Sequence, residues 1–197
     1  NMQRQFGFGA KTPLQFPGEG SGLVVTPKEK ETSRRATVSY GYGLQVTLAQ
    51  VAQAYSALAA GGVMHPLTLI KDDKKQPSKR IMAHEQAMSI VQMLESVTEP
   101  GGTAKAAAID GYRVAGKTGT SRRINPKGGY YSDQYRNVFA GMAPASNPKL
   151  VGVMLIEDPR GQIYAGLTVA PVFHNVMKEA LRLYNVPLDK PLKTEEQ

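Results

Sequence analysis

The sequence predicts an α+β fold in which an antiparallel sheet is flanked by helices. Two segments in the first half, residues 47–59 and 84–97, repeat apolar residues at the spacing of a buried helix face. After residue 110 the pattern shifts toward the alternation of β-strands, and a last helical pattern follows near residue 170. The strand-like segments are residues 112–120, 138–143 and 150–157. Helices, then strands, then a final helix are typical of an α+β domain.

Composition divides the chain into four parts. Residues 1–40 predict an ordered loop region, because Gly and Pro disfavour long helices, whereas Phe6, Phe8 and Phe16 are unusual in a flexible linker. The remaining parts are a helical part over residues 41–109, a sheet and C-terminal helix over residues 110–186, and a tail over residues 187–197 that we expect to fray.

The first predicted helix has signals at both ends. Thr47 is a good N-cap, and Gln50 stands three residues later, as in a capping box. Gly61-Gly62 ends the helix, since glycine readily adopts the left-handed conformation that follows a helix. The residues expected on the buried face are Leu48, Val51, Ala52, Tyr55, Leu58 and Ala59.

The next elements are a strand, a turn and a second helix. Residues 63–70 are apolar and partly β-branched, which predicts a strand. Residues 71–80 carry charges of both signs and no aromatic residue, which favours a solvated hairpin over a nucleic-acid patch. The second helix spans residues 84–97, with these residues expected inward: Ala87, Ile90, Val91, Leu94 and Val97.

The second half of the chain contains a loop, a turn and a last helix. Residues 122–136 predict a polar loop, and Asn147-Pro148 predicts the tight turn of an antiparallel hairpin. The last helix starts near Ala170, with Pro171 in its first turn. The residues expected on its buried face are Val172, Phe173, Val176, Met177, Ala180, Leu181 and Tyr184.

The residue content excludes several classes of protein. Lys and Arg number 24 against 16 Asp and Glu, and the resulting charge of +8 gives a basic surface that attracts anions. No run reaches the roughly 18 to 20 apolar residues that a membrane-spanning helix needs. The absence of cysteine excludes disulfides, thiolate nucleophiles and zinc–cysteine sites, and the three histidines are scattered. We therefore expect no metal and no cofactor.

Lys117-Thr118-Gly119 is the candidate functional motif. On a strand it offers a cation, a hydroxyl and a residue without a side chain, where a ligand backbone can approach closely. Since side chains alternate along a strand, a site that uses both Lys117 and Thr118 lies along the strand edge. We expect this strand to line an open cleft and to pair with residues 138–143. The simpler interpretation is an exposed strand end with an ordinary lysine.

The triplet and the segments around it resemble the class B penicillin-binding proteins of the cell-division type. Lys117-Thr118-Gly119 is similar to the K-T-G element of the penicillin-recognising serine enzymes. The segment 41–55 is similar to the one that follows the nucleophile half of their transpeptidases. Other similar segments, in the family's order, are Phe6-Gly7-Phe8-Gly9, Pro17-Gly18-Glu19, Gly101-Gly102-Thr103-Ala104, Phe139-Ala140-Gly141 and Ala170-Pro171-Val172-Phe173. The resemblance covers nearly the whole chain and implies a penicillin-binding/β-lactamase-like transpeptidase fold.

The resemblance implies peptidoglycan D,D-transpeptidation during septal cell-wall synthesis. In that reaction a serine takes an acyl group from D-Ala-D-Ala and passes it to an amine of another strand, and β-lactams acylate the same serine. The resemblance implies that the backbone N–H of Thr120 stabilises the oxyanion and that Gly119 admits the ligand. Thr118 and Thr120, with Lys117, would bind the substrate carboxylate, and Lys117 would help to move the proton of the leaving amine.

Three further residues are candidates for the rim of the site. Arg122 either attracts anionic peptide or begins a solvated loop. Tyr135, with Tyr130 and Tyr131, forms either an aromatic wall over the ligand or packing within the loop. Tyr164, followed by Ala165-Gly166, looks like the family's Tyr-Gly-Gly at the cleft mouth, with Ala165 as a departure; packing is the alternative.

The family's nucleophile elements are missing from this sequence. A literal S-x-x-K occurs as Ser146-Asn147-Pro148-Lys149, but it follows the K-T-G, lies on a predicted turn, and contains a proline that prevents the helical turn bringing Lys beside Ser. No S-x-N triplet exists in the chain. We therefore expect the nucleophile, its lysine and the S-x-N serine to lie upstream of Asn1, and residues 1–197 to be the C-terminal portion of one transpeptidase domain.

The sequence also fits other functions. The chain fits a non-catalytic penicillin-binding sensor or scaffold that keeps the ligand-binding wall, or a β-lactamase. Nucleic-acid binding would rest on the +8 charge alone, and we expect none. The expected partners are peptidoglycan stem peptides, β-lactams, the N-terminal portion of the same protein and other division proteins. The resemblance implies the periplasmic face of the bacterial inner membrane, with an anchoring helix outside this chain.

Overall fold

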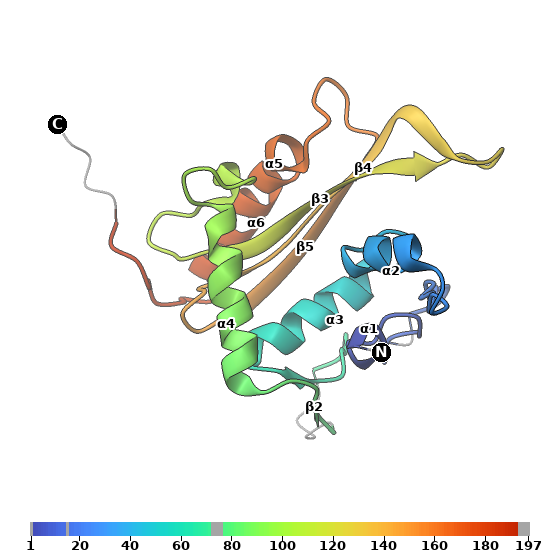
Figure 1. The fold of residues 1–197 in the computed structure, drawn as a ribbon. Helices are drawn as coiled ribbons and strands as arrows, with labels where there is room; N and C mark the ends of the chain where they lie inside the picture. The colour runs from blue at the N-terminus through green and yellow to red at the C-terminus, as the bar shows by residue number, and fades with distance from the viewer. Residues whose placement is uncertain (1, 15, 72–76, 193–197) are drawn as a thin grey trace.

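The computed structural model describes residues 2–14, 16–71 and 77–192. Its centre is a three-stranded antiparallel sheet in the order β3-β4-β5, and helices cover both faces (Figure 1). The strands are β3 (Ala115–Ile124), β4 (Tyr130–Ala143) and β5 (Leu150–Glu157). The helices α3 (Leu48–Ala59) and α4 (His84–Leu94) lie on one face, and α5 (Ala165–Thr168) and α6 (Ala170–Leu183) lie on the other. The predicted α+β class, with an antiparallel sheet and flanking helices, is confirmed.

The larger core lies between the sheet and α6. Phe139 on β4 and Phe173 on α6 are fully buried, and their ring centroids lie 4.7 Å apart in an edge-on arrangement. The glycines at positions 141 and 152 make room for this packing, because a Cβ at either would lie 3.0 Å from the Phe173 ring. The predicted start of α6, with Pro171 in the first turn, is confirmed.

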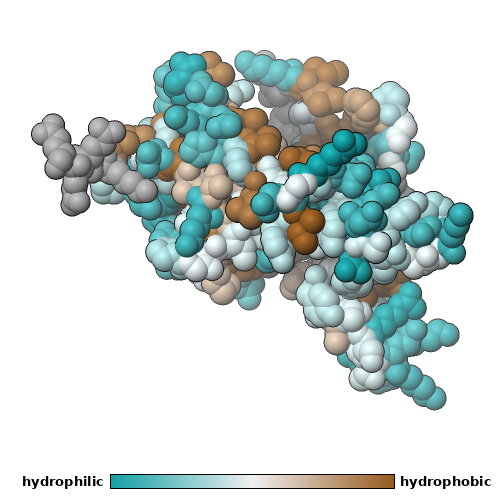
Figure 2. All heavy atoms as spheres, turned by 90° about the horizontal axis from the view of Figure 1, so that it is seen from above, coloured by the Kyte–Doolittle hydropathy of each residue, from teal (hydrophilic) through white to brown (hydrophobic). Residues whose placement is uncertain are grey.

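The predicted buried face of α6 is partly wrong. Its fully buried residues repeat at the helical spacing and are Ala170, Phe173, Met177 and Leu181. Val172, Val176 and Tyr184 are exposed by 40%, 51% and 73%, because the sheet covers only a narrow stripe of the helix. Exposed apolar side chains interrupt a largely hydrophilic surface, which Figure 2 shows from above as separate brown patches.

The helix α3 has the predicted ends. The Thr47 side chain accepts from the Gln50 backbone, and the Gln50 side chain accepts from the Thr47 backbone, which completes the capping box. At the other end, the Gly62 N–H donates to the Ala57 carbonyl at 2.8 Å and the Gly61 N–H donates to the Leu58 carbonyl at 3.0 Å. This pair of bonds is a Schellman motif, and both glycines have positive φ.

The buried face of α3 differs from the prediction. Its fully buried residues are Gln50, Gln53, Ala54 and Ala57, while the expected residues are half-buried and Leu48 is exposed by 43%. The reason is the N-terminal region, which packs on the glutamines. The Gln50 amide donates to the carbonyls of Ala10 at 2.6 Å and Ser21 at 2.8 Å.

The N-terminal region is ordered, as predicted, but it also contains two short helices, α1 (Met2–Gln5) and α2 (Thr32–Ser39). Within it, the Glu19 carboxylate accepts from both the backbone and the hydroxyl of Thr12, which holds one turn of the loop closed. The expectation of loop with only short extended pieces was therefore wrong for residues 2–5 and 32–39. Both helices are too short to form a strong sequence pattern.

The segment between α3 and the sheet also differs from the prediction. The expected strand over residues 63–70 is limited to β1 (Val63–Met64), which pairs with β2 (Lys79–Arg80). The predicted charged turn over residues 71–80 lies partly outside the described residues. The expected helix over residues 84–97 ends as α4 at Leu94 and continues as the short 3-10 helix η1 (Glu95–Val97); a second, η2 (Lys105–Ala107), precedes the sheet. Of the residues expected inward, Ala87, Val91 and Val97 are fully buried, and Ile90 and Leu94 are half-buried.

The expected polar loop over residues 122–136 is instead the end of a long β-hairpin. The strands β3 and β4 continue to Ile124 and Tyr130, which are paired in register, and a tight turn joins them. In that turn the Gly128 N–H donates to the Asn125 carbonyl at 2.9 Å. The first expected strand in turn begins only at Ala115 rather than at residue 112. The predicted antiparallel hairpin of β4 and β5 is confirmed, but its connection spans residues 144–149, with the turn at Ala145-Ser146 and a bend at Asn147.

Part of the C-terminal segment, for which we expect fraying, is hydrogen-bonded to the end of the sheet. The Asp189 carboxylate accepts from the Arg113 backbone at 2.7 Å and from the Ser146 hydroxyl at 2.6 Å, and the Tyr112 hydroxyl donates to the Val186 carbonyl at 2.6 Å. These bonds tie the segment across one end of the sheet. None of the helices formed by the described residues is long and apolar enough to cross a membrane.

Candidate active site

The Lys117-Thr118-Gly119-Thr120 segment lies on an edge strand. The strand β3 pairs with β4 alone within the three-stranded sheet, with Lys117 opposite Ala140 and Thr120 opposite Asn137. The predicted pairing with residues 138–143 is confirmed. An edge strand leaves alternate backbone N–H and C=O groups without a strand partner, so this segment offers backbone hydrogen bonds to a ligand.

The two threonines lie on the face of the sheet that carries α5 and α6. The Thr118 hydroxyl lies 2.9 Å from the Thr103 hydroxyl, in the loop before η2. The Thr120 hydroxyl accepts from the backbone N–H of Ala165, the first residue of α5, at 3.1 Å. Both hydroxyls are therefore held in place by their neighbours, and Thr120 is exposed.

Lys117 lies on the opposite face, as the alternation of the strand requires. It shares that face with Ala115, which packs in the core beside α4, but Lys117 itself is exposed. Its ammonium group donates to the Thr118 carbonyl at 3.0 Å. A ligand that contacts the ammonium and both threonine hydroxyls must therefore span the strand edge.

Gly119 lies between these side chains in open space. A Cβ at this position would meet only the Val138 side chain, at 3.9 Å. By contrast, a Cβ at Gly116 would lie 2.7 Å from the Ala140 carbonyl oxygen. Packing therefore requires glycine at position 116 but not at position 119.

The residues predicted for the rim lie at different places around this edge. Arg122 is exposed and pairs in register with Tyr135, which is half-buried. Tyr164 precedes α5 and is exposed by 63%. Since Ala165 bonds to Thr120, Tyr164 lies beside the K-T-G edge, whereas Arg122 and Tyr135 follow it toward the hairpin tip.

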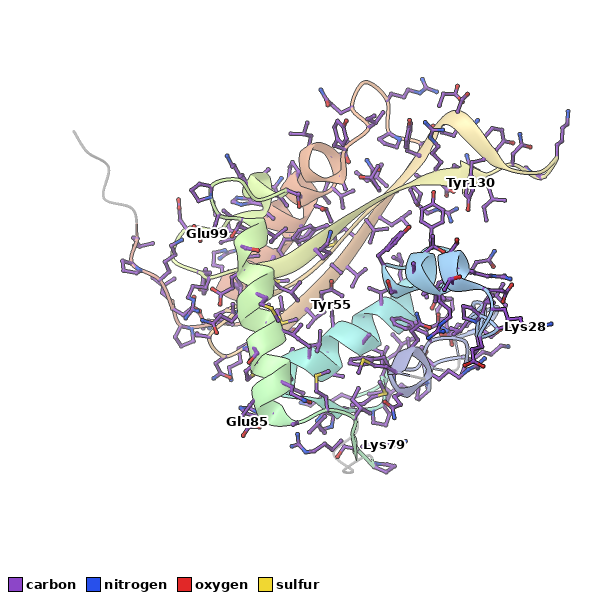
Figure 3. All side chains as sticks on the ribbon, in the orientation of Figure 1. Lys28, Tyr55, Lys79, Glu85, Glu99 and Tyr130 are labelled. Carbon is purple, nitrogen blue, oxygen red and sulfur yellow. The ribbon has the colours of Figure 1, made fainter. Side chains whose placement is uncertain are left out.

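The hairpin is held by charges and by tyrosines. Arg136 and Arg123 both form ion pairs with Glu157, and the hydrogen bond and positive charge of Arg136 lower the pKa of that carboxyl. At the tip, the rings of Tyr130 and Tyr42 lie 6.2 Å apart, edge to face. Figure 3 shows Tyr130 pointing from the hairpin toward the end of α2. Sequence reasoning missed this contact, because no local pattern links residues so distant in the chain.

The S-x-x-K of residues 146–149 lies on the predicted turn and not on a helix. The Ser146 hydroxyl donates to the Asp189 carboxylate, which lies at the opposite end of β3 from Thr120. This bond anchors the C-terminal segment to the turn after β4. Among the described residues, no cluster of three or more His, Asp or Glu side chains could hold a metal ion.

An apolar groove lies away from the K-T-G edge, between the N-terminal region and α3. It has a volume of about 660 Å³ and is lined by apolar side chains that include Phe6, Phe8, Val25, Tyr55 and Leu58. Burial raises the pKa of Tyr55 to about 12. Tyr55 also contacts the core between α4 and the sheet, and Figure 3 shows it on α3. The groove is not lined by Lys117, so the cleft expected at that residue stays a prediction.

The antiparallel sheet, the flanking helices and the K-T-G edge strand indicate a penicillin-binding transpeptidase domain. The chain belongs to the penicillin binding protein transpeptidase domain family, whose profile matches residues 1–178. The resemblance identified from the sequence is thereby confirmed at the level of the family.

Relatives of known name and structure agree with this assignment. The chain is 41% identical over 186 residues to the peptidoglycan D,D-transpeptidase FtsI of Escherichia coli, covering 94% of this chain and 32% of that protein. It is 37% identical to the probable peptidoglycan D,D-transpeptidase PenA of Neisseria gonorrhoeae, covering 98% and 33%. The chain thus spans about a third of the length of the curated relatives it matches.

Solved structures share the fold. The transpeptidase domain of penicillin-binding protein 3 from Burkholderia pseudomallei matches with a TM-score of 0.88 and 39% identity, covering 97% of this chain and 58% of that one. Penicillin-binding protein 3 of Mycobacterium tuberculosis, in complex with ampicillin, matches with a TM-score of 0.86 and 33% identity, covering 97% and 47%. The predicted penicillin-binding fold is confirmed.

Proposed function

We propose that this protein is a serine-type peptidoglycan D,D-transpeptidase that cross-links stem peptides during septal cell-wall synthesis. In the reaction a serine oxygen attacks the carbonyl between the two D-Ala residues, the terminal D-Ala leaves, and an amine of a second stem peptide then displaces the serine. The names of the relatives support this reaction. Residues 1–197 are proposed as the C-terminal portion of the domain, with the serine, its lysine and the S-x-N serine in a preceding part of the protein.

The residues of β3 have separate roles in this proposal. The Thr120 backbone N–H supplies one donor of the oxyanion hole, since a donor on a strand edge needs no reorganisation as the negative charge develops. The Thr118 and Thr120 hydroxyls bind the terminal carboxylate of the substrate, assisted by the charge of Lys117. Lys117 also helps to return a proton to the leaving amine. Gly119 keeps the edge open for the peptide backbone.

The observation that carries the proposal is the arrangement of cation, hydroxyls and open edge on one strand. Lys117 lies on one face of an edge strand, and Thr118 and Thr120 lie on the other. Gly119, between the two threonines in the sequence, has no side chain. An extended peptide lying along such an edge reaches all of them at once. The rim residues Arg122, Tyr135 and Tyr164 would contact the more distant parts of the same ligand.

β-Lactams are proposed as inhibitors that acylate the same serine. The Mycobacterium tuberculosis relative has been solved in complexes with ampicillin and with aztreonam. The carboxylate or sulfonate of such a drug would occupy the place of the substrate carboxylate, next to Thr118 and Thr120. We further propose that the protein acts at the periplasmic face of the inner membrane, through an anchor outside this chain, with other division proteins as partners.

Lys117→Ala in the complete protein tests the proposal. We expect acylation by a fluorescent penicillin to slow by about 10² to 10⁴ in rate, the usual contribution of a positioned proton-transfer group. The fold should be retained, because Lys117 is exposed. Lys149→Ala is the matched control, since Lys149 is an exposed lysine on the turn after β4. Equal rates for Lys117→Ala and the parent would remove Lys117 from the mechanism; reversible binding without acylation by the parent would favour a sensor.

A further inference from the structure

Asn137 is a buried polar side chain directly behind the K-T-G edge. It lies on β4, opposite Thr120 in register, and is fully buried. Its amide Nδ2 donates to the Thr168 hydroxyl at 2.8 Å, but its Oδ1 atom is buried with no partner in the described structure. Buried polar atoms are normally hydrogen-bonded, so this side chain needs an explanation.

The direction of the bond to Thr168 is fixed by the hydroxyl itself. The Thr168 hydroxyl donates its one proton to the Tyr164 carbonyl, at 3.2 Å. It can therefore only accept from Asn137, which places the amide nitrogen toward Thr168 and leaves Oδ1 alone. Asn137 thus holds the last residue of α5, and through it the carbonyl of Tyr164.

The helix α5 depends on such tertiary contacts for its position. It has only four residues, and a helix this short is not stable by itself. Its other attachments reach the K-T-G strand. The Ala165 N–H donates to the Thr120 hydroxyl, and the backbone of Gly166 lies so close to the Thr103 carbonyl that a Cβ there would be 1.8 Å from its oxygen. Thr103 in turn contacts Thr118 through their hydroxyls.

We propose that Asn137 is a positioning residue for the ligand-binding edge. Through Thr168 it holds α5, and α5 sets both the Thr120 hydroxyl and the exposed Tyr164 side chain. Asn137 cannot touch a ligand, because it is fully buried. The inference rests on the proposed function, in which Thr120 and Tyr164 bind the ligand.

If Asn137 had a purely structural role, replacing it would change the stability of the fold and leave ligand binding unchanged. Within the described part of the chain, its amide makes one hydrogen bond and leaves one atom unsatisfied, so an apolar side chain of similar shape should keep or raise the stability of the fold. If positioning is the role, Asn137→Leu should retain the melting temperature of the parent but weaken ligand binding. Thr168→Val removes the same connection from the other side while keeping the volume of the side chain.

The experiment measures acylation of the complete protein by a fluorescent penicillin over a range of concentrations. We expect Asn137→Leu and Thr168→Val each to raise the half-saturating concentration about tenfold, the scale of effect that a small misplacement of a binding group produces. The maximal rate should change less, because Lys117 is untouched. The double variant should be no worse than Thr168→Val, since both single variants break the bond between Asn137 and Thr168, and Thr168→Val also removes the bond to the Tyr164 carbonyl. Thr168→Ser keeps the hydroxyl and should restore binding.

The outcomes separate this inference from the proposed function. An unchanged half-saturating concentration in both variants would overturn it, whatever happens to the melting temperature, as would two effects that add fully in the double variant. If Asn137→Leu fails to fold, Thr168→Val decides by itself, because Thr168 is half-buried and near-isosteric with valine. Failure of the parent to be acylated at all would instead contradict the proposed function.

Discussion

The two faces of the sheet are packed in different ways. Against α6 the sheet forms a continuous core, in which Phe139, Phe173 and Leu181 are fully buried. Against α3 and α4 the fully buried set is smaller, and Tyr55 and Leu58 are only half-buried beside an open apolar groove. Figure 1 shows both sets of helices against the sheet. The comparison indicates that packing on the α6 face stabilises the fold, while the α3 face leaves part of its apolar surface exposed.

The K-T-G strand lies at the border between these faces. Its threonines are held from the α6 face, by Ala165 of α5 and by Thr103. Its lysine points to the α3 face and is exposed. A closed face that fixes the two hydroxyls that we propose bind the ligand, next to an open face that leaves the lysine accessible, is the arrangement a preorganised site needs.

The largest effect on the free energy of unfolding is expected from a substitution in the core between the sheet and α6. Phe173→Ala removes a fully buried ring from the core, and we expect a loss of about 3 to 5 kcal/mol in the free energy of unfolding. Val176→Ala on the exposed side of the same helix should change it by less than about 0.5 kcal/mol. Urea unfolding of both variants checks the difference. Similar losses for the two would contradict the assignment of the buried stripe.

The burial of Tyr55 on the α3 face can be tested at high pH. Burial raises the pKa of Tyr55 from its ordinary value of 10.0 to about 12 in the folded state. The folded protein then retains a proton that the unfolded chain loses, so the contribution to stability is complete below pH 10 and is lost as the pH rises toward 12. Tyr55→Phe should remove this part of the alkaline loss, as measured by melting temperature against pH. Identical alkaline profiles for variant and parent would show that Tyr55 is not buried.

The smallest effect on stability is expected from the ion pairs of Glu157 at the hairpin. The pKa of Glu157 is lowered by the hydrogen bond and charge of Arg136, so its contribution is present above the ordinary value of 4.5 and is lost as the pH falls through the folded value. Glu157 is exposed, which makes the contribution small. Glu157→Gln should lower the melting temperature slightly at pH 7 and not at pH 3. A loss of the same size at both pH values would exclude the charge as its cause.

The features predicted from the sequence are those with local causes. The capping box of Thr47 and Gln50 and the glycine stop at residues 61 and 62 each depend on neighbouring residues, and each is confirmed. The pairing of the K-T-G strand followed from chain order and is also confirmed. The family followed from several short motifs in a fixed order.

The features missed depend on contacts between distant residues. The strands of the hairpin over residues 122–136 are polar on both sides, so no alternation marks them, and cross-chain pairs such as Arg136 with Glu157 hold them instead. Gln50 is buried on α3 because carbonyls from the N-terminal region meet it. Asp189 fixes the tail through Arg113 and Ser146, which are far away in the sequence. Nothing local predicts these partners.

The position of the covalent adduct tests the central claim most directly. The complete protein is treated with a penicillin, digested, and the adduct is located by mass spectrometry. The account predicts an adduct on a serine outside residues 1–197, with labelling strongly reduced by Lys117→Ala and unchanged by Ser146→Ala. An adduct on Ser146, or on any other serine of this chain, would contradict the claim that the chain supplies the K-T-G wall and not the nucleophile.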